Sequence, residues 1–304
     1  MKKYAPYLIV FAAFLWSTDA LLRQPLTEHL SSTVIVFYEH LFGVILLFPI
    51  LIRGARQYLR LGRRDWLAVL FIGVGGSALA TIFFTASFSY VSPSVAILLQ
   101  KVQPIIAIVL ATVLLKERLG RKFWIGATVA MGGAYFISFP QGIPSLAFDD
   151  AKGVYFALIA AFFWGASTVF GRYVIKKISF PNLTALRLVV ALIFITILMT
   201  TQRQLGDLGT VSTSDIWSLL LITIFPGTGA LLLYYWGLKY TKASVATIAE
   251  LFFPFSAVAL NWIFLGEALV LVQIIGSLVL IAGIYFVQKA NRMNHQPNAP
   301  PTGE

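Results

Sequence analysis

The chain has 304 residues, of which 59% are hydrophobic and 12% charged, with a net charge of +11 and no cysteine. Counted with Gly and without Tyr, the apolar share is about 63%, against roughly 45–50% in soluble domains. This composition excludes a soluble globular protein and a disordered one, because so much apolar surface must face hydrocarbon. The absence of cysteine excludes disulfides and thiolate metal sites, so we expect no metal and no cofactor.

Ten apolar runs, each about as long as a bilayer is thick, follow one another along the chain. They lie near residues 4–22, 34–52, 66–86, 94–115, 123–139, 153–173, 183–200, 216–238, 244–265 and 270–288. The connections between them are short. The polar tail over 291–304 contains three prolines and is predicted to be disordered.

The positive charges lie between these spans, which excludes nucleic acid as the partner that +11 would otherwise suggest. Eighteen Lys and Arg fall on the side of the amino terminus, and only Arg23, Lys152 and Arg203 fall on the other. Cytoplasmic loops of membrane proteins retain positive charge. The count therefore predicts a multi-pass protein of the cell (inner) membrane, embedded in the lipid bilayer with both termini in the cytoplasm.

The second half of the chain repeats the first. Ala12–Trp16 recurs as Ala160–Trp164 at an offset of 148, and residues 65–137 match the segment 150 positions later at 20 of 73 places. This match also argues against reading the first span as a cleaved signal peptide, the alternative that Lys2-Lys3 suggests.

Each copy contains five spans, and because five is odd the second copy enters the bilayer from the opposite side. We therefore predict an all-α integral membrane fold of ten transmembrane helices as two inverted five-helix repeats, which is typical of secondary transporters that work by alternating access. The first repeat is placed at 1–145 and the second at 151–290.

The order of residues in both copies resembles the drug/metabolite transporter (DMT) superfamily, EamA type. The shared pattern consists of Trp16, Tyr90-x-x-x-Ser94-Val95-Ala96, Pro104, Glu117, Gly126 and Gly133, and of Trp164, Tyr240-x-x-x-Ser244-Val245-Ala246, Pro254, Glu267, Gly276 and Gly283. The resemblance implies a ten-helix inverted repeat that moves small metabolites, often outward. The copies depart from each other at Lys116 against Gly266 and at Lys101 against Leu251.

Four charged residues fall well inside the predicted spans: Glu39, Lys101, Arg187 and Glu250. Each costs about 2.5–3.5 kcal/mol at a helix centre on insertion scales, so partners or water are required. Their depths predict the ion pairs Glu39–Lys101 and Arg187–Glu250 at the border of a substrate cavity. Permanent locks between helices are the alternative.

Two prolines, Pro104 and Pro254, are predicted to kink spans 4 and 9. Gln100, Lys101 and Glu250 lie one turn earlier, which predicts that these two helices form cavity walls. Bends that serve packing alone remain the alternative.

Trp16 and Asp19 share one face of the first span, and Trp164 matches Trp16 in the sixth. We expect all three to line the cavity. The alternatives are an interfacial aromatic belt for the tryptophans and, for Asp19, solvation at the external end of the span. His40 is a further candidate because it can titrate next to Glu39, although a structural role is the favoured interpretation of a lone intramembrane histidine.

No Walker or dinucleotide motif is present, since Gly73-Val74-Gly75-Gly76 lies inside an apolar helix, and no constellation of catalytic residues appears. The sequence thus predicts a secondary transporter and not an enzyme. We expect export of a small metabolite such as an amino acid or other zwitterion, with protons as a candidate coupling ion. Uptake of a nutrient or vitamin by the same fold is the first alternative, and a channel or an intramembrane enzyme comes after it.

Overall fold

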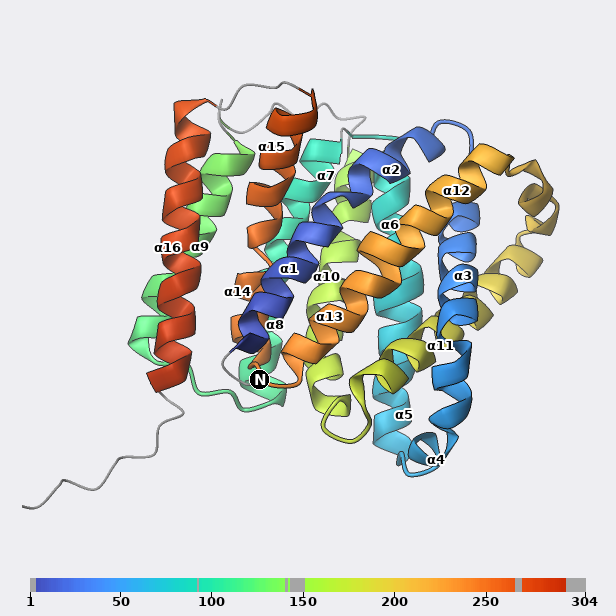
Figure 1. Ribbon diagram of the computed structural model, residues 1–304, viewed down its shortest axis with the longest axis horizontal. Helices are drawn as coiled ribbons and strands as arrows, with labels where there is room; N and C mark the ends of the chain where they lie inside the picture. The colour runs from blue at the N-terminus through green and yellow to red at the C-terminus, as the bar shows by residue number, and fades with distance from the viewer. Residues whose placement is uncertain (1–3, 92, 140–141, 143–150, 266–269, 294–304) are drawn as a thin grey trace, which may run out of the picture.

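The computed structural model describes residues 4–91, 93–139, 142, 151–265 and 270–293, and every regular element in these ranges is a helix (Figure 1). In chain order the ten spans are α1 (Ala5–Ser17) with α2 (Asp19–Leu26); α3 (Ser32–Arg53), followed by the short α4 (Ala55–Tyr58); α5 (Arg63–Leu70), the π-helix η2 (Phe71–Leu79) and α6 (Ala80–Ser87); α7 (Pro93–Leu99), the 3-10 turn η3 (Gln100–Val102) and α8 (Gln103–Leu114); α9 (Arg121–Ser138); α10 (Ala151–Val174); α11 (Phe180–Thr201), followed by η5 (Leu205–Thr210); α12 (Thr213–Ile222), the π-helix η6 (Thr223–Gly227) and α13 (Thr228–Leu238); α14 (Ala243–Ala249) with α15 (Phe252–Leu265); and α16 (Leu271–Met293).

Within the described ranges, nine of these spans are long and apolar enough to cross a membrane. The remaining one, α9, has 18 residues and begins with Arg121 and Lys122, which lower its mean hydropathy. Large apolar side chains stay exposed on the outer helix faces, including Ile45 and Leu278, as expected where lipid is the solvent. The predicted all-α membrane fold is confirmed.

The two halves carry the same helix irregularities at one fixed spacing. Asp65 accepts a hydrogen bond from the Gly62 backbone N–H (3.0 Å), and 150 residues later Asp215 accepts one from Ser212 (2.9 Å). The two π-helical turns and the breaks that follow α7 and α14 recur at the same spacing. Such agreement arises when both halves descend from one folding unit.

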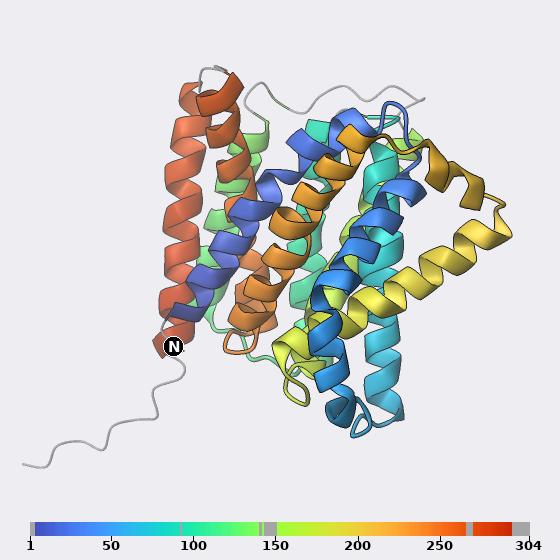
Figure 2. The same cartoon turned by 45° about the vertical axis from the view of Figure 1, so that its right-hand side comes forward.

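The direction of the chain is reversed between the halves. α1 begins and α16 ends at the same end of the bundle, whereas α10, the counterpart of α1, begins at the opposite end (Figures 1 and 2). The helices also pair as a two-fold relation requires: α1 packs on α13 and α10 on α6, while α3 pairs with α11 and α9 with α16. The fold is therefore an inverted repeat.

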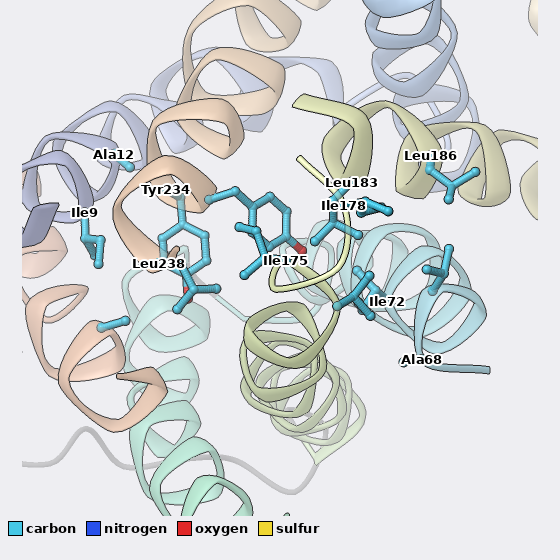
Figure 3. Packing of buried hydrophobic residues seen from close by; sticks show 14 of the residues in the cluster. Ile9, Ala12, Ala68, Ile72, Ile175, Ile178, Leu183, Leu186, Tyr234 and Leu238 are labelled. Atoms are coloured by element: carbon cyan, nitrogen blue, oxygen red, sulfur yellow. The ribbon is translucent and has the colours of Figure 1, made fainter. Parts of the chain in front are cut away.

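A hydrophobic core joins the halves near the end where α1 begins. It brings Ile9 and Ala12 of α1 together with Tyr234 and Leu238 of α13, and extends through the α10–α11 connection to Ile72 of η2 (Figure 3). Because these side chains come from both repeats, neither half completes this core alone.

Breaks in the fourth and ninth spans begin four residues before a proline. The 3-10 turn starts at Gln100, four residues before Pro104, and α14 gives way to a turn at Glu250, four residues before Pro254. Proline lacks the N–H that would bond to that carbonyl, and its ring clashes with it. The irregular backbone places the polar side chains of Gln100, Lys101 and Glu250 inside these two spans.

One boundary prediction is wrong. The first span does not end at residue 22 but continues as α2 to Leu26, so Arg23, which the charge count placed in an external loop, is inside the helix and 3% exposed. Arg23 can lie inside the helix because it forms ion pairs with Asp19, four residues earlier, and with Glu39 of α3. At the other end, α16 includes residues 291–293, and the rest of the predicted tail, 294–304, lies outside the described residues, as does Glu267.

Candidate functional site

A cavity of about 170 Å³ lies between the two halves. Its walls include all the residues predicted to bind substrate, namely Trp16, Asp19, Glu39, His40, Gln100, Lys101, Trp164, Arg187 and Glu250. Pro104 also lines it, whereas Pro254 is not among its lining residues. The structure thus brings the candidate residues together, and their role as ligands of the substrate remains a prediction.

Arg23 organises the charged groups of the first half. Its Nε and Nη2 atoms donate to the two oxygens of Asp19 at 2.7 and 2.8 Å, and Nη2 also donates to Glu39 Oε2 at 2.9 Å. Nη1 lies 3.2 Å from the Thr85 hydroxyl oxygen. One guanidinium therefore bridges two carboxylates, a charge-assisted arrangement that offsets the cost of burying all three groups.

Arg187 has no such carboxylate among the described residues. Its Nε atom donates to Ser77 Oγ at 2.7 Å and its Nη1 atom to the Tyr235 hydroxyl at 2.8 Å. The guanidinium carbon lies 5.5 Å from the centre of the Tyr235 ring, within the range of a cation–π contact. The side chain is 5% exposed, so a full positive charge is buried with neutral partners.

Glu250 is held by neutral donors at the break between α14 and α15. Tyr234 donates its hydroxyl to Oε1 and Gln103 donates an amide N–H to Oε2, both at 2.7 Å. Thr168 is 2.9 Å from the Tyr234 hydroxyl oxygen and extends the chain of hydrogen bonds to α10. Lys101 lies over the Phe253 ring, with its Nζ atom 4.2 Å from the ring centre.

Neither expected ion pair, Glu39–Lys101 or Arg187–Glu250, is present in the described part of the chain. Depth along the membrane normal does not fix the direction in which a side chain points, and each expected partner is engaged elsewhere. The alternative interpretation, in which these two ion pairs hold helices together permanently, is therefore wrong as well.

Two aromatic pairs cross the boundary between the repeats. Trp16 contacts Tyr234 with ring centres 5.2 Å apart, and Trp164 contacts Phe84 at 5.1 Å. The pairs are equivalent, because Trp16 corresponds to Trp164 and Phe84 to Tyr234. All four rings line the cavity, so planar apolar surface is available from both halves.

Several polar atoms of the cavity wall are buried without a hydrogen-bond partner in the described part of the protein: Gln100 Oε1, Ser167 Oγ and Thr247 Oγ1. His40 is different, since its Nδ1 atom donates to the Val36 carbonyl at 2.8 Å, which is a structural role. Unsatisfied buried polar groups are costly, and those on the wall of a cavity can be completed by a ligand that binds there.

Sequence reasoning missed Arg23, Tyr234 and Tyr235. The spacing of Asp19 and Arg23, four residues apart, is a signal for a helical ion pair and could have identified Arg23. The tyrosines carry no such signal, because an apolar run with Tyr234-Tyr235 is equally compatible with lipid-facing positions. Among the described residues, no cluster of three His, Asp or Glu could hold a metal ion.

The comparisons with known proteins agree with this architecture. The model of the EamA-like transporter family matches residues 3–139 and again 151–288. A solved structure titled "Crystal structure of protein" has the same fold, with a TM-score of 0.76 and 18% identity over 96% of this chain and 99% of that one.

Curated relatives are named as transporters. The chain is 32% identical to the riboflavin transporter ImpX of Fusobacterium nucleatum, over 93% of this chain and 97% of that protein. It is 25% identical to the uncharacterized inner membrane transporter YhbE of Escherichia coli K12, over 96% and 94%, and 27% identical to the uncharacterized transporter YdfC of Bacillus subtilis, over 76% and 74%. The chain therefore belongs to the EamA-like transporter family of the drug/metabolite transporter superfamily, and it is a membrane transporter of small molecules rather than an enzyme.

Proposed function

We propose that the protein carries a neutral, planar aromatic metabolite of the riboflavin type by alternating access. The single observation that carries this proposal is the charge balance of the cavity. Its three carboxylates, Asp19, Glu39 and Glu250, are matched by three cations, Arg23, Lys101 and Arg187. This balance disfavours a substrate with a net charge; among substrates without one, the aromatic walls favour a planar ring system over a small zwitterion.

The aromatic walls support the same substrate class. Trp16 and Trp164 reach the cavity from equivalent positions of the two halves, and stacking on such rings is worth about 1–3 kcal/mol per base in other proteins that bind planar heterocycles. The unpartnered polar atoms of Gln100 and Thr247 suit a ligand rich in hydrogen-bonding groups. The name of the relative from Fusobacterium nucleatum, a riboflavin transporter, supports the choice among planar heterocycles.

Export of an amino acid or another zwitterion is the second candidate. Asp19 and Glu39 together carry one negative charge more than Arg23 neutralises, while Arg187 carries an uncompensated positive charge. These two clusters could receive an ammonium group and a carboxylate. A small zwitterion has no ring that could stack on the aromatic walls of the cavity, and we therefore rank this candidate second.

We further infer that the end of the bundle where α1 begins faces the cytoplasm. Arg53, Arg56 and Arg60 around α4 lie at that end, and so do Arg63 and Arg64 at the start of α5 (Figure 1), in agreement with the positive-inside rule. If protons drive transport, Asp19, Glu39 and Glu250 are the cavity residues able to carry them. Without coupling, net flux of a neutral substrate follows its gradient, which leads inward where the cell consumes the vitamin.

Binding to the purified protein tests the substrate class. We expect riboflavin to raise the melting temperature and to lose fluorescence on binding, whereas leucine leaves the melting temperature unchanged. Stabilisation by leucine with no effect of riboflavin would overturn the proposal in favour of the zwitterion.

Replacement of the cavity tryptophans tests where the ring system binds. Trp16→Ala and Trp164→Ala should each weaken riboflavin binding about 5- to 150-fold, the equivalent of 1–3 kcal/mol of lost stacking. Trp217→Ala is the matched control, since Trp217 is 65% exposed at the start of α12 and away from the cavity. If fluorescence titration gives the same riboflavin affinity for all three variants, stacking on these two rings is excluded.

A further inference from the structure

The inverted repeat places one cluster of four positions twice around the cavity. Asp19, Arg23, Glu39 and Thr85 in the first half correspond to Ser167, Gly171, Arg187 and Tyr235 in the second. In each cluster one arginine contacts the side chain at the position of Thr85 or Tyr235. The arginine, however, comes from a different position in each copy.

In the first copy, residues of the same cluster use the hydrogen-bond donors of the arginine. Both carboxylates of the cluster, Asp19 and Glu39, bond to Arg23. This guanidinium therefore has little capacity left for a substrate.

The second copy has no carboxylate at the equivalent positions. Ser167 stands at the position of Asp19, and the arginine itself, Arg187, stands at the position of Glu39. Gly171 replaces Arg23, and a Cβ atom at Gly171 would lie 2.7 Å from the Tyr235 ring, so Tyr235 fills the space of the missing side chain. Arg187 thus keeps its charge without an acidic partner in the described part of the chain.

Arg187 also keeps free donors. A guanidinium has five N–H groups, and the bonds from Nε to Ser77 and from Nη1 to Tyr235 use two of them. The donors of Nη2 have no partner among the described residues. This side chain lines the cavity although it is almost fully buried.

Ser167 lies beside these donors. Its hydroxyl is buried, with the residue 4% exposed, and has no partner within the described ranges. Gly76 of η2 makes room for this approach, since a Cβ atom at Gly76 would overlap with Ser167 Oγ and lie 3.5 Å from Arg187 Nη2. The absence of a side chain at Gly76 thus lets the Ser167 hydroxyl lie next to Arg187 Nη2, and Gly76, Ser167 and Arg187 all line the cavity.

We propose that Arg187 and Ser167 form the subsite that receives the carbonyl edge of the flavin ring system, the dione end of the isoalloxazine; this inference rests on the proposed function. Three free N–H groups on a buried cation require an acceptor, and carbonyl oxygens are acceptors without a donor of their own. Hydroxyls of the ribityl chain are weaker acceptors and bring additional hydrogens.

The position of Trp164 fits the same pose. Trp164 lies three residues before Ser167 on α10, so both side chains are on one face of that helix. A ring stacked on Trp164 can direct one edge toward Ser167 and Arg187.

Titration with two flavins tests this subsite. Riboflavin contains the ring and the ribityl chain, whereas lumiflavin has the same ring with a methyl group in place of the chain. We expect Arg187→Met to weaken both flavins by the same factor, about 10- to 150-fold for a hydrogen-bonded charge. Ser167→Ala should weaken both about 3- to 10-fold and leave the melting temperature unchanged or higher, because the hydroxyl that it removes has no partner.

Ser256→Ala and Arg172→Met serve as matched controls. Ser256 is buried and bonded to the Phe252 carbonyl, and Arg172 donates to the Lys239 carbonyl; neither lines the cavity, so flavin affinity should not change.

The outcomes separate the two levels of the proposal. A wild-type protein that binds neither flavin overturns the proposed function and this subsite with it. Wild-type binding that Ser167→Ala and Arg187→Met leave unchanged overturns the subsite alone, and so does a loss of affinity for riboflavin but not for lumiflavin, which would assign the groups to the ribityl chain. Because Ser167→Ala removes an unpartnered hydroxyl, it keeps the test decisive if Arg187→Met does not fold.

Discussion

Buried charge is handled differently in the two halves of the protein. Arg23 shares its hydrogen bonds between Asp19 and Glu39, whereas Arg187 depends on Ser77 and Tyr235. A saturated ion cluster stabilises a helix contact, and a charge left with neutral partners is available to a ligand. The same four positions of the repeat thus support two different roles.

Removal of Arg23 should destabilise the protein severely. Arg23→Met leaves two buried carboxylates without their cation, for which the loss of a buried pair predicts about 3–5 kcal/mol. The melting temperature in detergent measures the effect.

The triple variant Arg23→Met with Asp19→Asn and Glu39→Gln should recover most of that loss, because no unpaired charge remains. Lys176→Met is the control, since Lys176 is exposed in the connection between α10 and α11. Equal melting temperatures for Arg23→Met and Lys176→Met would contradict a structural role for the cluster.

The sequence largely predicts which residues line the cavity, but it does not predict which groups they bond to. Glu39, Lys101, Arg187 and Glu250 stand out because charge is rare in apolar spans. Their contacts depend on helix rotation and on tyrosines such as Tyr234, which resemble ordinary apolar positions in the sequence.

At the scale of elements, glycines set how closely α9 and α16 approach. A Cβ atom at Gly133 would lie 2.6 Å from Leu280 Cα and 2.7 Å from the Gly276 carbonyl oxygen, and Gly283 is similarly close to Ala130. Small residues permit such contact between membrane helices, where packing replaces the hydrophobic effect as the driving force.

Two neighbouring glycines of α9 give a direct test of this packing. Gly133→Ala should destabilise the protein by about 1–3 kcal/mol through overpacking, whereas Gly132→Ala should have little effect because nothing lies within 4 Å of its Cβ position. Thermal unfolding of both variants checks this, and a larger loss for Gly132→Ala would contradict the observed face of contact.

Helix breaks were predictable from Pro104 and Pro254, because proline disturbs the carbonyl four residues earlier. The π-helical turn of η2 was not, although its glycines at Gly73, Gly75 and Gly76 are visible in the sequence. A wide turn forms there because α10 and α11 approach these glycines from the other repeat, and the sequence of one helix does not contain that contact.

At the scale of the whole molecule, the inverted fold follows from the number of spans in each copy. Five spans in each copy require that the copies be inverted, and the family model matches both copies. The charge count did not foresee that Arg23 lies inside a helix, because a carboxylate four residues away allows α2 to continue. The direction of transport is not fixed by such a symmetric architecture.

The proposal that this symmetric cavity carries a neutral flavin is tested most directly by counterflow in proteoliposomes. Vesicles with the purified protein are loaded with unlabelled riboflavin and diluted into a trace of labelled riboflavin. We predict transient accumulation of label inside, absent from vesicles loaded with leucine and from protein-free vesicles. No accumulation with riboflavin inside, or counterflow of labelled leucine instead, would contradict the account.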